Sequence, residues 1–311
     1  MDKDTVQTEE GWLTTPDGHK LYTKMWMPNT APKARVVCLH GFSDHCNMYP
    51  FLFSSLAQEG IKVYSFDQRG WGRSVHEPRQ RGLTGPTEQV MEDLTTFITA
   101  LPQSEQDVPL FLMGHSMGGG EAIVYTATGP REVVSRIRGV LLDAPFISLP
   151  PSEMPWKSTI ALGRLASRFM PHRPLLQKLD SSSMCRDPDV CQAWLDDPLC
   201  HDTGTLEGLA GFMDRSFGLK EGRILLEDGL CEGGKTRLWV GHGTKDGLAD
   251  YTVTRQWYEG AHVDDKELRT YEGWYHKLHS EPGEDKVRFA RDVATWVLDR
   301  AGPLSDVKSK L

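Results

Sequence analysis

Short runs of apolar residues recur along the chain, and each is followed by Gly, Asp or Pro. Each run is rich in β-branched or aromatic residues, a pattern typical of buried parallel strands whose two faces are both covered. The runs that we expect to form strands are Val36–Leu39, Lys62–Phe66, Leu110–Met113, Val140–Leu142, Leu238–Val240 and Leu268–Tyr271. Before them, the segment Trp12–Trp26 places a Pro16-Asp17-Gly18 turn between two β-type runs, which predicts a hairpin.

Helical patterns lie between these runs. Pro86 suits the first position of a helix, and apolar residues then repeat every three or four positions up to Leu101. A last helix is expected over Glu284–Arg300, where an apolar stripe follows acidic residues. Strands that alternate with helices predict an α/β fold with a mostly parallel sheet flanked by helices. Ligands of such sheets bind beyond the carboxyl ends of the strands.

The alternation of strands and helices stops between about Leu149 and Gly222. Prolines open this stretch, and Trp156–Met170 then carries apolar and basic residues in the pattern of an amphipathic helix. Two interpretations remain open: a helix that packs on the core, or an inserted cap whose apolar surface faces a lipid or a substrate. We expect residues 1–149 and 223–311 to form the α/β core and residues 150–222 to form a helical cap, or lid.

Composition and charge narrow the classes of partner. The 311 residues include 43 acidic and 35 basic side chains, a formal charge of −8, which argues against nucleic acid because phosphate binding needs a basic surface. The acidic, polar Met1–Glu10 segment does not resemble a secretion signal, and no apolar run is long enough to span a membrane. We therefore expect a cytoplasmic protein.

The six cysteines are irregularly spaced, so free thiols are expected. The group Cys185, Cys191, Cys200 and His201 lacks the short-spaced pairs of structural zinc sites. The sequence therefore predicts neither a disulfide framework nor a metal site.

The strongest candidate for chemistry is the Gly114–Gly118 turn, with Ser116 at its centre, between a predicted strand and a helical run. It matches G-x-S-x-G, in which a serine nucleophile occupies a tight turn from strand to helix. Such a turn requires small residues beside the serine, and Gly114 and Gly118 meet this requirement. A phosphate loop is disfavoured, because no Lys-Ser or Lys-Thr pair follows the glycines. We therefore expect Ser116 to be the nucleophile.

A serine nucleophile needs a base and an acid, and in this fold the acid and then the histidine follow the serine along the chain. His276 and His279 lie in the loop after the last predicted strand, and we expect His276, nearer the strand end, to be the base. Asp246 follows the strand before it, where a carboxylate can fix the tautomer of the imidazole. Asp143 and Asp250 remain alternatives for the acid.

The backbone amides that would stabilise an oxyanion are predicted at Phe42 and Met117. In G-x-S-x-G hydrolases one N–H comes from the residue after the nucleophile, and another comes from a loop after an earlier strand. His40-Gly41-Phe42 follows such a strand, and we expect His40 to support this loop rather than to take part in the chemistry.

Several motifs together resemble the monoacylglycerol lipase family of α/β-hydrolases, from about Trp12 to Trp296. They are His40-Gly41, Asp67-Gln68-Arg69-Gly70-Trp71-Gly72-Arg73-Ser74, Gly114-His115-Ser116-Met117-Gly118-Gly119, Asp143-Ala144-Pro145, Gly243-Thr244-Lys245-Asp246 and Tyr271-Glu272-Gly273-Trp274-Tyr275-His276. The resemblance implies the α/β-hydrolase fold, and it implies a triad and oxyanion donors at the positions already given. The Asp44–Met48 loop and details of the cap depart from the animal members.

The resemblance also implies an activity, the hydrolysis of monoacylglycerols to glycerol and free fatty acid through an acyl-enzyme, without a metal or cofactor. The partner is then a lipid substrate, and the family's cap implies peripheral contact with membranes or lipid droplets. The alternatives are a lysophospholipase or another carboxylesterase on the same scaffold, an acyltransferase variant, and a non-catalytic lipid-binding protein.

Overall fold

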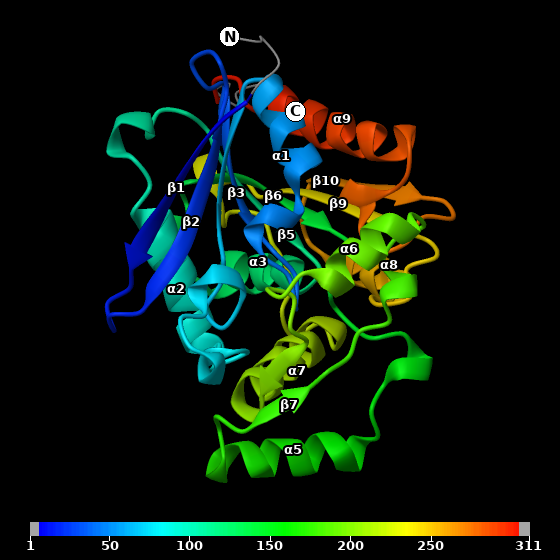
Figure 1. Cartoon of the computed structure of the whole chain (residues 1–311). Helices are drawn as coiled ribbons and strands as arrows, with labels where there is room; N and C mark the ends of the chain where they lie inside the picture. Colours follow the sequence, from blue (N-terminus) through cyan, green and yellow to red (C-terminus); the bar gives the residue numbers. More distant parts are fainter. Residues whose placement is uncertain (1–5, 305–311) are drawn as a thin grey trace.

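An eight-stranded sheet forms the centre of the computed structural model, with the order β1-β2-β4-β3-β5-β6-β9-β10 (Figure 1). β1 and β2 are antiparallel to each other, and β2 is antiparallel to β4, whereas the strands from β4 to β10 are parallel. The strands are β1 (Gln7–Thr14), β2 (Lys20–Met27), β3 (Ala34–Leu39), β4 (Ile61–Phe66), β5 (Leu110–His115), β6 (Ile137–Asp143), β9 (Arg237–Gly243) and β10 (Asp265–Tyr271). The predicted mostly parallel α/β sheet is confirmed.

The structure describes residues 6–304, so the first half of the polar Met1–Glu10 segment lies outside the described residues. None of the described helices is long and apolar enough to cross a lipid bilayer. The predicted hairpin is present, because β1 and β2 pair from Gln7 with Met27 to Thr14 with Lys20. Gly18 closes the turn between them at φ 86°, a conformation that favours glycine.

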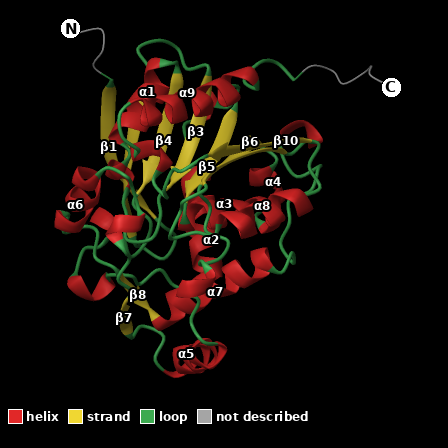
Figure 2. Ribbon diagram, turned by 90° about the vertical axis from the view of Figure 1, so that its right-hand side faces the viewer, coloured by secondary structure: helices red, strands yellow, loops and turns green. Residues whose placement is uncertain are grey.

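Helices cover both faces of the sheet (Figure 2). The helices of the two covering layers are α1 (Pro50–Gln58) and α9 (Glu284–Asp299) on one face, and α2 (Thr87–Thr99), α3 (Met117–Thr128), α4 (Arg131–Val134) and α8 (Tyr251–Gly260) on the other. Alternate residues of one strand enter different cores: Val37 packs in the cluster with α2 and α3, whereas Val36 packs in the cluster with α1 and α9. This explains why the central strands are apolar without interruption.

Between β6 and β9 the chain leaves the main sheet. It forms α5 (Lys157–Phe169), α6 (Pro188–Asp196), α7 (Leu206–Lys220) and a small antiparallel sheet of β7 (Pro174–Leu176) and β8 (Thr203–Thr205). α7 packs against α2 and α3, and α5 packs on α7, farther from the sheet (Figures 1 and 2).

Most of the large apolar residues of α5 and its start are exposed rather than packed on the core. Trp156 is 83% exposed, Leu162 is 66% exposed and Phe169 is 77% exposed. No α5 residue whose burial the structure describes is buried. The interpretation of this segment as a core-facing helix is therefore wrong, because α5 packs mainly on α7 and leaves most of its large apolar side chains exposed.

Candidate active site

The predicted site residues lie beyond the carboxyl ends of parallel strands, at one edge of the sheet. Phe42 follows β3 and Ser116 follows β5, while Asp246 and His276 follow β9 and β10. Phe42, Ser116 and His276 line one pocket of about 270 Å³, and Asp246 contacts His276 from within the protein. Met117 is the first residue of α3, directly after Ser116.

Ser116 occupies a strained turn between β5 and α3. Its φ is 53° and its ψ is −117°, a region that residues other than glycine rarely adopt and that is typical of functional sites. The backbone N–H of Ser116 donates to the oxygen of Asp143 at 3.0 Å. A Cβ atom on Gly114 would lie 2.1 Å from the oxygen of Gly118, and one on Gly118 would lie 2.5 Å from the oxygen of Leu39. Both positions therefore require glycine, as the sequence motif indicates.

Asp246 is a buried carboxylate with four hydrogen-bond donors. Its Oδ1 accepts from the backbone N–H groups of Leu248 and Ala249 at 2.8 and 2.9 Å. Its Oδ2 lies 2.7 Å from Nδ1 of His276 and 3.0 Å from Nε2 of His242. Burial opposes ionisation, but the two histidines hold the pKa of Asp246 well below its usual range. The carboxylate is therefore ionised at neutral pH.

The bond to Asp246 fixes the state of the His276 ring. Because the carboxylate accepts from Nδ1, the neutral ring carries its proton there, and Nε2 keeps a lone pair. His276 and Ser116 line the same pocket. An imidazole in this state can take a proton from a hydroxyl that meets Nε2, and a carboxylate on Nδ1 stabilises the imidazolium that results.

A second buried His–Asp group lies beside the first. Asp143 Oδ2 is 2.8 Å from Nδ1 of His279 and 3.1 Å from Nδ1 of His115, and all three side chains are buried. Burial lowers the pKa of His115 to about 4 despite the nearby carboxylate. Asp250, the other alternative acid, accepts from the backbone N–H groups of Thr252 and Val253 in the first turn of α8. Both alternatives are thus engaged elsewhere, and neither is paired with His276.

The loop after β3 lies against the serine. A Cβ atom on Gly41, the residue before Phe42, would lie 3.2 Å from Cβ of Ser116. His40 is buried, and both of its ring nitrogens bond to backbone groups, so it supports the loop as predicted. The first amides of a helix have no acceptor within the helix, so the N–H of Met117 at the start of α3 is available to an anion.

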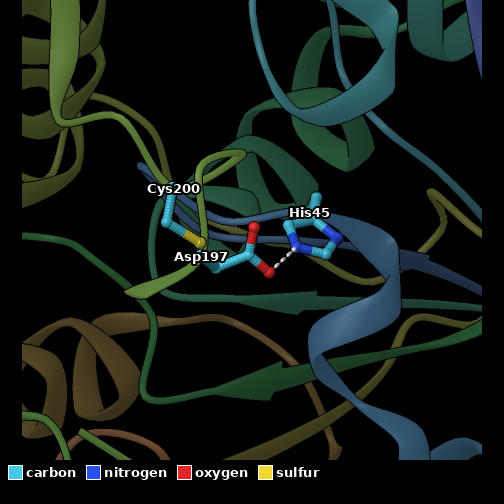
Figure 3. Close-up of side chains that lie close together, drawn as sticks. All are labelled: His45, Asp197 and Cys200. Carbon is cyan, nitrogen blue, oxygen red and sulfur yellow. Dashed lines mark hydrogen bonds and ion pairs between the residues drawn. The ribbon is translucent and has the colours of Figure 1, made fainter. Parts of the chain in front are cut away.

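Two groups of described side chains have a donor set that could hold a metal ion. Their ligand atoms lie within 4.8 Å of one another, and they are His45, Asp197 and Cys200 (Figure 3), and His115, Asp143 and His279. In the first group, Nδ1 of His45 accepts from the backbone N–H of Asn47 at 3.3 Å. Its proton is therefore on Nε2, which donates to Asp197 at 3.0 Å. The imidazole and the carboxylate thus bond to each other directly, and this bond joins the loop after β3 to the segment after α6.

Most of the pocket wall is apolar and comes from the inserted segment. The lining side chains of α5 and α7 include Ile160, Leu206, Leu209, Ala210, Phe212 and Met213. Three charged side chains, Asp44, Arg164 and Lys277, also lie in the wall. The dimensions and composition fit a ligand with a long apolar part and a small polar part.

Comparisons with known proteins identify the family to which the chain belongs. Residues 30–283 match a family described as serine aminopeptidase, S33. A putative monoglyceride lipase of Schizosaccharomyces pombe is 35% identical over 93% of this chain and 74% of its own length. The chain belongs to the monoacylglycerol lipase family of α/β-hydrolases. It is accordingly an enzyme of the carboxylic ester hydrolase class.

Other members of the monoacylglycerol lipase family match over nearly their whole length. The monoglyceride lipase of Rattus norvegicus is 29% identical over 93% of this chain and 90% of its own. Among solved structures, a soluble variant of Saccharomyces cerevisiae monoglyceride lipase in complex with a substrate analog has a TM-score of 0.83 and 26% identity. That match covers 97% of this chain and 99% of the yeast chain.

The sequence interpretation missed three features of the site. His242 shares Asp246 with His276, and its only signal was its place at the end of a predicted strand. His279 is bound to Asp143 at 2.8 Å, and it does not line the pocket. Lys277 follows His276 directly, but nothing in the motif indicated that a lysine would be buried there.

Proposed function

We propose that this protein hydrolyses the ester bond of monoacylglycerols, giving glycerol and a free fatty acid. The observation that carries the proposal is the 2.7 Å bond between Asp246 and His276, made at the edge of an apolar pocket that His276 shares with Ser116. Relatives named monoglyceride lipase support the choice of substrate, and the pocket supports it by combining an apolar wall with a few polar groups.

In the first half of the reaction, His276 takes the proton of the Ser116 hydroxyl as the oxygen attacks the ester carbonyl. The backbone N–H groups of Phe42 and Met117 hold the oxyanion, and each such donor contributes about 2.7–4 kcal/mol to transition-state binding. Asp246 stabilises the imidazolium. His276 then protonates the glycerol oxygen, which leaves an acyl group on Ser116.

In the second half, water replaces the serine hydroxyl as nucleophile. His276 takes a proton from the water as its oxygen attacks the acyl-enzyme, and the same two amides hold the new oxyanion. The imidazolium returns its proton to the Ser116 oxygen as the fatty acid leaves. In these steps the side chains and amides of the chain act on two reactants, the ester and one water molecule.

The proposal assigns residues 150–222 to a cap that covers the pocket and contacts a lipid surface. Trp156, Leu162 and Phe169 are exposed on or beside α5, and Arg164 and Arg168 lie on the same helix. A helix with exposed apolar residues and basic neighbours fits the boundary between lipid headgroups and acyl chains. α5 also contributes to the pocket wall, so contact with lipid would bring the acyl chain to the site.

The test is hydrolysis of a long-chain 1-monoacylglycerol by the wild-type protein and by Ser116→Ala. The expected loss of kcat is at least about 10⁴-fold, because the nucleophile and its base act as one unit. Ser55→Ala is the control, since the Ser55 hydroxyl donates to the backbone oxygen of Phe51 within α1 and Ser55 does not line the pocket. If the alanine variant at position 116 kept more than a hundredth of the wild-type kcat, the assignment would be wrong.

A further inference from the structure

Three side chains with metal-binding atoms meet where the loop after β3 contacts the inserted segment: His45, Asp197 and Cys200 (Figure 3). Nε2 of His45 lies 3.0 Å from Oδ2 of Asp197, and the ligand atoms of all three lie within 4.8 Å of one another. His45 precedes Asp197 by 152 positions, so spacing along the chain did not reveal the group. None of the three lines the pocket that contains Ser116, and the proposed ester hydrolysis uses none of them.

The backbone holds each of the three residues in place. Asp197 and Cys200 lie in one turn, in which the backbone N–H of Cys200 donates to the oxygen of Asp197 at 3.0 Å. Oδ1 of Asp197 accepts from a backbone N–H of the same turn at 2.8 Å, while Oδ2 faces His45. Next to His45, the backbone N–H of Cys46 donates to the Asp67 carboxylate at 2.8 Å. The donor set is therefore preorganised, which lowers the entropy cost of binding an ion.

Solvent reaches two of the three side chains. The side chain of Asp197 is 25% exposed, whereas that of His45 is 5% exposed. All six cysteines lie in the described part of the chain, and Cys200 is the one that is not buried. An ion can therefore reach the group through its carboxylate and its thiol without opening the core.

The charges around Cys200 favour a cation. The carboxylates of Asp44, Asp197 and Asp202 are close enough to act on its thiol, and the ammonium of Lys277 opposes them. Burial first, and then these carboxylates, raise the pKa of Cys200 well above its ordinary value. The thiol therefore keeps its proton at neutral pH until a metal ion displaces it.

We propose that His45, Asp197 and Cys200 bind a borderline divalent cation such as Zn²⁺, with water as the fourth ligand. One imidazole, one carboxylate and one thiolate fit zinc, whereas Mg²⁺ and Ca²⁺ take oxygen ligands. With bonds of about 2.0–2.3 Å, the ligand atoms of a tetrahedral zinc ion lie about 3.3–3.6 Å apart. The 3.0 Å between His45 and Asp197 is close to this separation. The assignment does not depend on the proposed ester hydrolysis.

Binding of the ion rearranges two protons. The thiol of Cys200 releases its proton to solvent, because only the thiolate binds the ion. The His45 ring moves its proton from Nε2 to Nδ1, so that Nε2 can bind the ion. This shift gives up the bond from the backbone N–H of Asn47 to Nδ1, which is long at 3.3 Å. One proton is released for each ion, so binding strengthens as pH rises.

The experiment is a titration of the untagged, reduced and metal-free protein with Co²⁺, followed by displacement with Zn²⁺. Co²⁺ binds the same ligands as Zn²⁺, and a bond to thiolate gives it an absorption band in the near ultraviolet. We expect one Co²⁺ per chain with this band, loss of the band when Zn²⁺ is added, and one proton released in calorimetry. The apparent Tm should rise with the concentration of Zn²⁺ but not with that of Mg²⁺.

Matched variants identify the ligands. Cys200→Ser should abolish the thiolate band, and Asp197→Asn should weaken Co²⁺ binding by at least about 10-fold. Cys231→Ser and Asp196→Asn remove the same kinds of group from positions outside the cluster, and both should keep the band and the affinity. Thermal denaturation of the metal-free variants shows whether each is folded.

The proposal is overturned if the wild type gives no thiolate band, if Cys200→Ser keeps the band, or if Cys231→Ser loses it. Equal affinity of Asp197→Asn and the wild type for Co²⁺ would also contradict it. None of these outcomes depends on ester hydrolysis, which Ser116→Ala tests separately.

Discussion

Replacing Asp246 by Asn tests whether this carboxylate sets the protonation state of His276. The two side chains have nearly the same shape, so packing is kept while one oxygen becomes an NH₂ group. At this site Oδ1 faces two backbone N–H donors, and Oδ2 faces His276 and His242. The NH₂ of the amide can face either the two backbone N–H groups or the two histidines.

The hydrogen bonds decide this choice. If the NH₂ of the amide faced the two backbone N–H groups, both would lose their acceptor, at about 1–3 kcal/mol for each buried group. The NH₂ therefore turns toward the histidines, and His276 must accept through Nδ1 and carry its proton on Nε2. A preference of about 2 kcal/mol makes the productive tautomer about 30-fold rarer, at 1.36 kcal/mol for each factor of ten. Loss of the negative charge adds to this, for a total near the 10⁴-fold seen when such an acid becomes an amide.

The assay is steady-state hydrolysis of a 1-monoacylglycerol by Asp246→Asn, beside thermal denaturation of the same preparation. Asp250→Asn is the matched control, because Asn also caps a helix and the candidate active site does not use this residue. We expect the control to keep kcat within about twofold. If Asp246→Asn were folded and kept more than a tenth of the wild-type kcat, another group would be orienting the histidine and the reasoning would fail.

Three further predictions follow from packing, charge and exposure. Gly118→Ala places a Cβ atom 2.5 Å from a backbone oxygen at the end of β3, so we expect about 1–3 kcal/mol of lost stability by thermal denaturation and a lower kcat. Burial would raise the pKa of Asp44, but neighbouring cations, Lys277 first, hold it at about 2, below the ordinary 3.8. The stability that this carboxylate contributes is therefore lost as pH falls from about 4 to about 2, and Lys277→Met should move acid unfolding, followed by fluorescence, to higher pH. Trp156→Ser/Phe169→Ser should weaken binding to phospholipid vesicles in sedimentation while hydrolysis of a dispersed short-chain monoacylglycerol is kept.

Controls for two of these predictions use residues away from the features tested. Lys245→Met should leave acid unfolding unchanged, because Lys245 is exposed. Val287→Ser, on α9 and 38% exposed, should leave vesicle binding unchanged. An unchanged acid midpoint in Lys277→Met would show that the lysine does not stabilise the Asp44 charge. Undiminished vesicle binding after both α5 substitutions would contradict the proposed lipid contact.

Much of the site could be predicted from the sequence because parallel strands present their carboxyl ends at one edge of a sheet. Ser116, Asp246 and His276 each follow a short apolar run, and this alone places them near one another. The glycines around the serine added a steric requirement that the backbone confirms, since Gly114 and Gly118 have no space for a side chain.

The parts that could not be predicted depend on contacts between loops. Asp143 follows a strand as Asp246 does, and only the folded loop shows that its partners are His279 and His115. The burial of Lys277 depends on Asp44, more than 200 positions earlier in the chain. Hydrophobic periodicity also does not show which part of the protein, if any, packs on the apolar face of a helix. The pattern over Trp156–Met170 correctly predicted a helix. The exposure of that helix depends on its packing against α7, which the pattern does not show.

We propose that Ser116 is the nucleophile and that Asp246 and His276 activate it. The most direct measurement is the rate and position of labelling by a fluorophosphonate, followed by peptide mass spectrometry. We expect a single modified residue, Ser116, in the wild-type protein, and labelling slowed by at least about 100-fold in His276→Ala and Asp246→Asn. Modification at another residue, or labelling of Ser116 at the wild-type rate in both variants, would contradict it.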